Sequence, residues 1–512
     1  SLSMQIFKTL TMKKSFFVGA LIAMAGLSFQ SCEKLSSINE NPNEPSNVDA
    51  GVLFTEGVRS SVSTSVNQSY LLGNVASQLA AKTLRAVIGE YSWNAFPNTW
   101  NQNYASLGNI IEAERVAAEA GNAQMEGAAK VMKSWAFSTL TLAYGDIPYS
   151  EAITGSTSAN WFPAYDTQEQ IITGTDGLLE ELAEAVQLLD NGGSIQGDIL
   201  FNGDAAKWKK LANAMRLRLL MYISEKQNVS AEFAAIVANE SLMESNADNG
   251  ILTYTGNFPN EYPLVPLKQG DFDAVAISTN AHAALDSLND PRMYVYARPN
   301  NASTVFADPS IAATYDGADN GSTAISASCD KNGSRLGYAY YNYPGHDQAG
   351  TMAEGIIMTY AEQQFLLAEA AHNGWITDDA GTHHASGVQA SMEYYGADFG
   401  MTGWTDFADY IANSGAGYDN SINSIREQKW LAMFFTGLDN YFEVRRWYTQ
   451  ESGNWANLPF ISAPCSNTNG DVLPMRFLYP GNEASLNPDN YFNAIDVLGG
   501  NTQNTKMWVV DL

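Results

Sequence analysis

Long segments of this chain repeat their apolar residues at the spacing of an α-helix. In residues 205–224, Trp208, Leu211 and Met215 fall on one stripe, and the lysines and arginines lie away from it. Residues 126–145 show a similar stripe and end at Gly145, a residue that commonly terminates helices. The spacing predicts an amphipathic helix in both segments.

Residues 355–374 carry two apolar stripes instead of one. Met358 and Phe365 belong to the first stripe, and Tyr360 and Leu367 belong to the second. A helix of this kind must be buried on two sides, as in stacked helical hairpins whose members cover both neighbours. We therefore expect a mainly α fold built from such hairpins.

Further helices are expected along the same chain. Residues 421–447 have a helical pattern that breaks at Gly437 into two pieces. Three more segments have helical character, namely residues 101–120, residues 177–189 and the stretch around 233–243.

Residues 250–350 differ from the helical segments, because Gly, Asn, Ser, Pro and Tyr dominate and the periodicity fades. Loops of such length are usually functional or disordered. A cluster of Tyr338, Tyr340, Tyr341 and Tyr343 near Arg335 favours an ordered surface that faces a ligand or a partner. The sequence also predicts loop structure for the tail, residues 451–512.

The start of the chain has the pattern of a secretory signal, with Lys13 and Lys14 before an apolar run over residues 16–27. The run is too short to cross a bilayer. We expect residues 1–31 to be a signal peptide, in which residues 1–11 are an upstream artefact of start-site choice. Cys32 is the expected lipidation site. An ordinary signal with an incidental Cys at this place stays an alternative.

The domain plan that follows has three parts: the signal peptide, the lipidated Cys and linker over residues 32–50, and a single domain over residues 51–512 with a loop-rich insert at about 250–350. The linker is rich in Asn, Glu, Ser and Pro. Of the three cysteines in the chain, Cys329 and Cys465 remain to pair, and the sequence leaves open whether they do.

A formal net charge of −28 makes nucleic acid a poor candidate ligand and favours neutral or cationic partners. The usual catalytic and nucleotide-binding motifs are missing from the sequence. No cofactor and no metal site is expected. A glycoside hydrolase that uses two carboxylates stays open, because acidic residues are abundant.

Residues 90–104, EYSWNAFPNTWNQNY, combine aromatic rings with amides. The flat faces of sugar rings stack on such rings, and sugar hydroxyls bond to amides, so neutral glycans fit both the residues and the charge. Trp100 and Tyr104 lie four residues apart, which favours a core role for them. Tyr91 and Trp93 could equally be core residues or ligand contacts.

Several segments together resemble the SusD/RagB family: NPNEPSNV, TWNQNYASLGNI, LAYGDIPYSEA, KWKKLANAMRLRL, MTYAEQQFLLAEAA, IREQKWLAMFFTGLDNYFEVRRW and RFLYPGNEASLN. The resemblance implies a tetratricopeptide-like helical scaffold with a loop-rich region on one side. It also implies a lipid-anchored, surface-exposed outer-membrane protein of Bacteroidota. Such a protein binds a glycan or another nutrient, catalyses no reaction and delivers its ligand to a SusC-like TonB-dependent transporter.

The ligand-binding candidates on this view are Arg85, Tyr91, Trp93 and Asn94, joined by Tyr340 and Tyr343 from the long loop. Arg445 and Arg446 are expected to form structural ion pairs. The ligand itself stays open, because some relatives bind peptides. A surface glycoside hydrolase and a protein-only adaptor of a transporter complex are the alternative functions.

Overall fold

The computed structural model describes residues 48–321 and 328–512, and of residue 156 only the backbone. The expected signal peptide, the expected lipidation site Cys32 and nearly all of the expected linker lie outside the described residues. Residues Ala50–Leu512 form one compact unit. Within the described part of the chain, no helix is both long and apolar enough to cross a bilayer.

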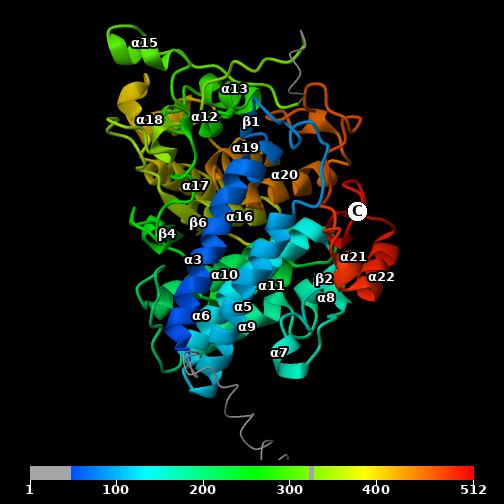
Figure 1. Ribbon diagram of the computed structural model, residues 1–512. Coiled ribbons are helices and arrows are strands. Elements are labelled where there is room, and N and C mark those ends of the chain that lie inside the picture. The colour runs from blue at the N-terminus through cyan, green and yellow to red at the C-terminus, as the bar shows by residue number, and fades with distance from the viewer. Residues whose placement is uncertain (1–47, 322–327) are drawn as a thin grey trace, which may run out of the picture. The chain divides into compact units, whose positions relative to one another are not determined.

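Long helices that pack on one another in chain order form the body of the molecule (Figure 1). The series runs through α3 (Ala50–Gln68), α5 (Pro97–Glu119), α6 (Ala123–Tyr144), α9 (Leu178–Leu189), α10 (Ala205–Tyr222), α16 (Tyr360–His372), α17 (Ala380–Tyr395) and α19 (Ile422–Ala432). Helices adjacent in the series lie side by side, as stacked hairpins require. The mainly α fold expected from the sequence is confirmed.

Local signals set the ends of the predicted helices. Asp204 caps α10 through its carboxylate, which accepts hydrogen bonds from the backbone N–H groups of Ala206 and Lys207. Asn122 caps α6 in a similar way, and α6 ends at Gly145, whose φ of 93° favours glycine. Both helices therefore lie where the apolar stripes predict them.

The segment 355–374 is only partly helical. Its first residues belong to β6 (Glu354–Met358), which pairs with β4 (Gly250–Thr253), and α16 begins after Thr359. The hydroxyl of Thr359 accepts a hydrogen bond from the Glu362 N–H and so sets the start of the helix. The apolar run Ile356–Met358 forms the strand. The predicted burial of the helix on two sides is confirmed, because Ala361–Ala370 are all buried.

The predicted break at Gly437 separates α19 from α20 (Asp439–Gln450). Gly437 has a φ of 66°, which most side chains disfavour. The carbonyl oxygen of Gly437 lies against Gly73. A Cβ at Gly73 would come within 1.8 Å of this oxygen, so position 73 also requires glycine. The two backbones therefore meet at a place where neither position accepts a larger residue.

The loop-rich region and the tail contain many short elements rather than loop alone. The remaining helices are α4 (Asn74–Ala76), α7 (Gly155–Ser158), α8 (Gln168–Thr173), α11 (Ser230–Asn239), α12 (Gln269–Phe272), α13 (Thr279–Ser287), α14 (Met293–Tyr296), α15 (Ala302–Ala307), α18 (Phe407–Asn413), α21 (Glu483–Leu486) and α22 (Pro488–Leu498). A π-helical turn, η1 (Ser69–Gly73), and short 3-10 turns, among them η3 (Tyr338–Tyr340), complete the list.

Strands are short and pair in twos. Besides β4 and β6, β1 (Ala80–Lys82) pairs with β5 (Val275–Ile277), and β2 (Ile147–Pro148) pairs with β3 (Tyr165–Asp166), both antiparallel. The pairing of β1 with β5 brings the segment after β1 to the loop-rich region.

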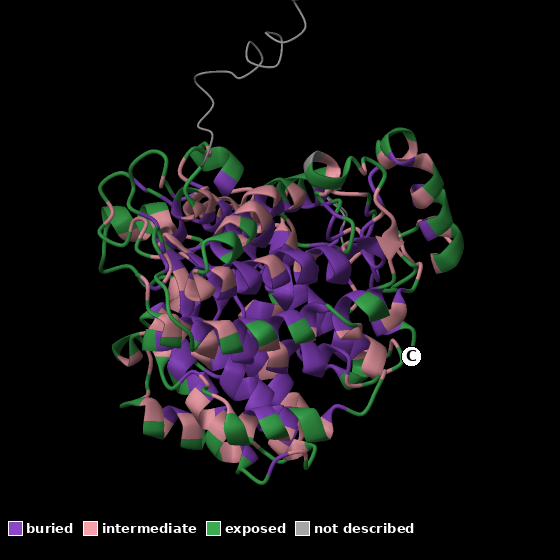
Figure 2. Cartoon of the chain, turned by 90° about the horizontal axis from the view of Figure 1, so that it is seen from below, coloured by how far each residue is buried: buried purple, intermediate pink, exposed green. Residues whose placement is uncertain are grey.

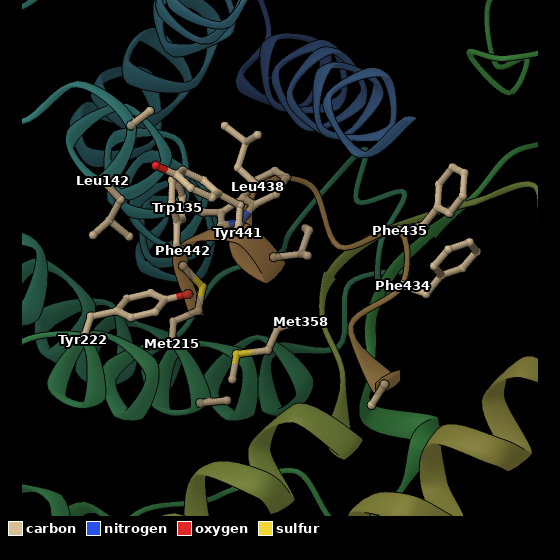
Figure 3. Close-up of a cluster of buried hydrophobic side chains, with 14 of the residues drawn as sticks. Trp135, Leu142, Met215, Tyr222, Met358, Phe434, Phe435, Leu438, Tyr441 and Phe442 are labelled. Atoms are coloured by element: carbon tan, nitrogen blue, oxygen red, sulfur yellow. The ribbon is translucent and has the colours of Figure 1, made fainter. Parts of the chain in front are cut away.

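The core runs through the helical body, where the buried residues concentrate (Figure 2). Figure 3 shows one cluster in it, in which Trp135 of α6, Met215 of α10 and Met358 of β6 meet Leu438 and Phe442 from the region around the break. Side chains far apart in the sequence thus share one apolar interior, which the hydrophobic effect stabilises.

Several buried charges in this interior form ion pairs. Arg446 forms ion pairs of 2.8 Å with both Glu369 and Glu443, and Lys429 lies 3.1 Å from Glu443. The expectation for Arg446 is therefore confirmed. The expectation for Arg445 is wrong: its guanidinium donates to the carbonyl oxygens of Leu142 and Met475. Backbone acceptors engage the Nη1 atom of this arginine where carboxylates were expected, and its buried Nε has no hydrogen-bond partner in the described part of the chain.

A disulfide joins Cys329 to Cys465, with 5.8 Å between the two Cα atoms. It connects the loop-rich region to the segment near the C-terminus, 136 residues further along the chain. The pairing that the sequence leaves open is thus settled.

Candidate ligand-binding site

A cavity of about 820 Å³ opens in the loop-rich region. We call it the tyrosine cavity. Its lining residues are Gln269, Asp273, Arg298, Pro299, Asn300, Ala302, Ser303, Phe306, Asn332, Gly333, Arg335, Tyr338, Tyr343, Pro344 and His346. The lining therefore combines aromatic rings, amides and charged groups, the mixture that small-ligand sites commonly contain.

Backbone pairing around β5 builds the wall of the cavity. The N–H of Ile277 donates to the carbonyl of Ser334 at 2.8 Å, and the N–H of Arg298 donates to the carbonyl of Arg335 at 2.9 Å. The segment around Arg335 is thus held between β5 and the chain at Arg298, which places the two arginines in adjacent stretches. Gly333 is required here, because a Cβ would come within 2.3 Å of the Ala318 nitrogen.

Arg298, Asp273 and Tyr343 form one bonded group in the wall. The guanidinium of Arg298 lies 2.7 Å from the Asp273 carboxylate, and it also donates to the hydroxyl of Tyr343. The same hydroxyl donates to Asp273 at 3.1 Å. Because these contacts fix the ring of Tyr343, the group is a rigid part of the cavity.

A second aromatic pair lies beside this group. The rings of Tyr338 and His346 stack with 3.6 Å between their centroids, and Tyr338 meets Tyr343 edge to face at 5.1 Å. Tyr338 is only partly buried. It can therefore offer a held aromatic surface to a ligand at little further cost in side-chain entropy.

Phe306 contributes the most open ring of the lining. It belongs to the short helix α15, which projects from the molecule in Figure 1, and its side chain is 76% exposed. An exposed ring that lines a cavity can contact the apolar face of a ligand. Amide groups of Asn300 and Asn332 line the same cavity.

Of the predicted site residues, Tyr343 lies in this cavity, whereas Tyr340 does not. Tyr340 is 2% exposed, and its ring stacks on Phe435 at 4.4 Å in the core. Tyr340 is the last residue of the short turn η3, whereas Tyr343 follows that turn and lines the cavity. Tyr340 therefore lies in the core and not in the lining of the tyrosine cavity.

Tyr91 and Trp93 are also core residues, 1% and 6% exposed. The indole N–H of Trp93 donates to the carbonyl of Ile88 at 2.9 Å, and its ring packs edge to face on Tyr441 and Phe477. A ring enclosed in this way has no free face for a sugar. Of the two readings that the sequence left open for these residues, the core reading fits their burial.

Arg85 and Asn94 are exposed. Arg85 follows β1, which pairs with one edge of β5, while Arg335 forms a backbone bridge with Ala276 of β5. The side chain of Asn94 stabilises the local turn, because its oxygen accepts a hydrogen bond of 2.8 Å from the N–H of Phe96. The structure therefore keeps Arg85 near the loop-rich region and separates it from the buried aromatic residues.

Sequence reasoning missed Arg298, Asp273 and Phe306. No motif joins them to the tyrosine cluster: Arg298 pairs through its backbone with Arg335, Asp273 lies just before β5, and Phe306 lies on α15. The stretch Arg298-Pro299-Asn300-Asn301 carries the only sequence signal, an arginine followed by amides inside a loop-rich region.

A second cavity, of about 610 Å³, lies against α5 and α6 and is lined by Phe137, Tyr149 and Lys133 among others. Its Lys133 is already engaged, at 2.8 Å from both Glu114 and Glu181. The tyrosine cavity is larger and has the more open ring, so it is the better candidate.

The chain matches a family model described as SusD-like, starch-binding and associating with the outer membrane, over residues 42–480. The chain belongs to the SusD-like family. The resemblance found in the sequence is thereby confirmed. This SusD-like chain has no match of significance among curated proteins.

Solved structures agree with the family. The SusD-like chain is 28% identical to an outer membrane protein of Bacteroides vulgatus for which a role in nutrient binding has been suggested, with a TM-score of 0.73 over 91% of this chain and 100% of that one. A SusD homologue of Bacteroides fragilis is 25% identical, with a TM-score of 0.70 over 90% and 99% of the two chains.

A chitin-binding SusD homologue of Flavobacterium johnsoniae is 19% identical to the SusD-like chain, with a TM-score of 0.70 over 90% and 98% of the two chains. This likeness concerns the fold.

Proposed function

We propose that this protein binds a glycan at the cell surface, in the tyrosine cavity, and delivers it to a SusC-like TonB-dependent transporter without cleaving it. The observation that carries the proposal is the lining of the cavity, where the exposed ring of Phe306 and the held ring of Tyr338 lie among amides and arginines. Such rings suit the apolar faces of sugars. The family membership supports the same conclusion.

The glycan is the first ligand class to test, because a solved structure of the same fold is of a chitin-binding protein. Membership of a family associated with the outer membrane supports lipid anchoring through Cys32 and a transporter as partner. Arg85 and Asn94 are each exposed outside the cavity lining, and we call them the rival surface.

Affinity electrophoresis against a panel of polysaccharides and peptides tests the binding. We expect at least one polysaccharide to retard the protein, and Tyr338→Ala to reduce the retardation. Tyr360→Ala is the matched control, since Tyr360 is also partly buried but lies on α16, outside the cavity lining. Retardation that is lost with Arg85→Gln but kept with Tyr338→Ala would move the site to the rival surface.

Two further measurements test the rest of the proposal. Incubation with the retained polysaccharide should release no reducing sugar, and release that a single carboxylate variant abolishes would favour a glycoside hydrolase. Purification from native membranes should recover a TonB-dependent transporter with the protein. A transporter recovered while every glycan and peptide fails to bind would favour the protein-only adaptor.

A further inference from the structure

The charge inside the tyrosine cavity is opposite to the charge of the chain. The chain has a formal net charge of −28, yet the lining holds Arg298 and Arg335 against a single carboxylate, that of Asp273. Arg298 and Asp273 neutralise one another through their 2.7 Å ion pair. One positive charge, that of Arg335, is therefore left over.

Arg335 has no partner for its guanidinium within residues 48–321 and 328–512. Its Nη1 atom is buried and makes no hydrogen bond there. Burial lowers the pKa of Arg335, which is the expected effect of taking a cation out of water. An arginine stays protonated in spite of such a shift, so a charged group with unused donors lines the cavity.

Arg335 differs from the buried arginines because each of those makes at least one side-chain hydrogen bond within the described residues, although single guanidinium atoms of Arg426, Arg445 and Arg476 also lack a partner there. Arg218 and Arg446 each form ion pairs with carboxylates, and Arg445 donates to two carbonyl oxygens. An unused buried donor costs free energy unless something occupies it. A bound ligand that carries an anion would supply the missing partner.

We propose that Arg335 receives the carboxylate or sulfate group of an acidic sugar residue, while Tyr338 and Phe306 contact the sugar rings. The inference rests on the proposed function and narrows its substrate to acidic glycans. The planar guanidinium can hold either oxyanion through two parallel hydrogen bonds. Overall charge favours neutral ligands, but at short range an unpaired arginine decides the preference.

Calorimetric titration with matched oligosaccharides tests the inference on the whole mature protein. One pair is an oligogalacturonate and its methyl ester, which share a backbone and differ in charge. The other pair is a sulfated galactan oligosaccharide and its desulfated form, which tells a sulfate from a carboxylate. We expect one acidic member to bind at least about tenfold more tightly than its neutral counterpart, as charge-assisted hydrogen bonds would give.

Variants assign the preference to Arg335. Arg335→Gln should remove the difference in affinity between the acidic and neutral oligosaccharides. Arg335→Lys should keep part of this difference, because lysine retains the charge but lacks the planar guanidinium that can form two parallel hydrogen bonds. Arg115→Gln is the charge control, since Arg115 is an exposed residue of α5 outside the cavity lining. Raising the salt from about 0.05 M to about 0.5 M should weaken acidic binding alone.

Each result has a definite meaning. Neutral glycans that bind as well as acidic ones, or an acidic preference that survives Arg335→Gln, would overturn the inference and leave the proposed function standing. An acidic peptide that binds while all glycans fail would overturn both. Circular dichroism should show the same spectrum for Arg335→Gln and the parent. The substitution removes no side-chain hydrogen bond or ion pair to another described residue.

Discussion

Arg446 of α20 donates two hydrogen bonds of 2.8 Å to the carboxylate of Glu369 on α16. The same guanidinium reaches Glu443, which also lies near Lys429. These buried contacts join helices that lie far apart in the sequence. Burial alone would raise the pKa of both glutamates. The positive charges of Arg446 and Lys429 instead lower the pKa of Glu443 to about 2, and they also lower the pKa of Glu369.

Glu443→Gln should lower the free energy of unfolding at pH 7 by about 3–5 kcal/mol, because it leaves buried cations without their partner. The pKa of Glu443 is lower in the folded protein than in the unfolded chain. The ionised Glu443 carboxylate therefore stabilises the fold above about pH 4.5, and this stabilisation is lost as the pH falls toward about 2. Urea denaturation at several pH values should therefore show the variant and the parent converging in acid. Glu56→Gln, at a partly exposed pair with Arg59, is the control and should cost little. A difference that stays constant down to acid would contradict the assignment.

Trp93→Ala should unfold the protein more easily rather than weaken binding selectively. The ring is enclosed by Tyr441 and Phe477, so its removal leaves a cavity and should cost about 3–5 kcal/mol. Chemical denaturation measures the loss. Ser92→Ala, at an exposed neighbour, should change stability by less than about 0.5 kcal/mol. A stable Trp93→Ala protein that no longer binds glycan would restore the ligand role of this residue.

Phe306→Ala should weaken glycan binding by about tenfold and leave the melting temperature unchanged, because the ring is exposed and packs on little else. Phe258→Ala removes another exposed ring, 88% exposed, that does not line the tyrosine cavity. Titration with the best polysaccharide from the panel compares the two. Equal effects of both variants would argue against a localised site.

Loss of the disulfide should destabilise the protein by about 2–5 kcal/mol, since it closes a loop of more than a hundred residues. The variant with both Cys329→Ser and Cys465→Ser should unfold at lower denaturant than the parent. Addition of a reductant should bring the parent to the same midpoint and leave the variant unaffected. A parent that is insensitive to reductant would show that the crosslink contributes little.

Sequence periodicity predicted the helices that bury one or two well-marked stripes. It located α6 and α10, and it placed the break between α19 and α20 at Gly437. It missed α3, although Phe54, Val58, Val62 and Val66 repeat every four residues and are all buried. The small polar residues between them have modest helix propensity, so tertiary packing decides the outcome.

The site was harder to predict than the scaffold. An aromatic residue between amides can be a core anchor or a ligand platform, and only the packing around Trp93 and Tyr340 separates the two roles. Tyr343 lines the tyrosine cavity, but its partners Arg298 and Asp273 come from segments that pair through backbone hydrogen bonds. Such pairing leaves little trace in a single sequence.

Cys329, which forms the disulfide with Cys465, precedes Asn332 and Arg335 of the cavity wall by only a few residues. Disulfides form in oxidising compartments and rarely in the cytosol. The covalent tether beside the cavity wall therefore forms only where the compartment is oxidising. Protein produced in a reducing host cytosol would hold the scaffold but lack this tether, so material secreted to an oxidising periplasm is the right starting point for ligand screening.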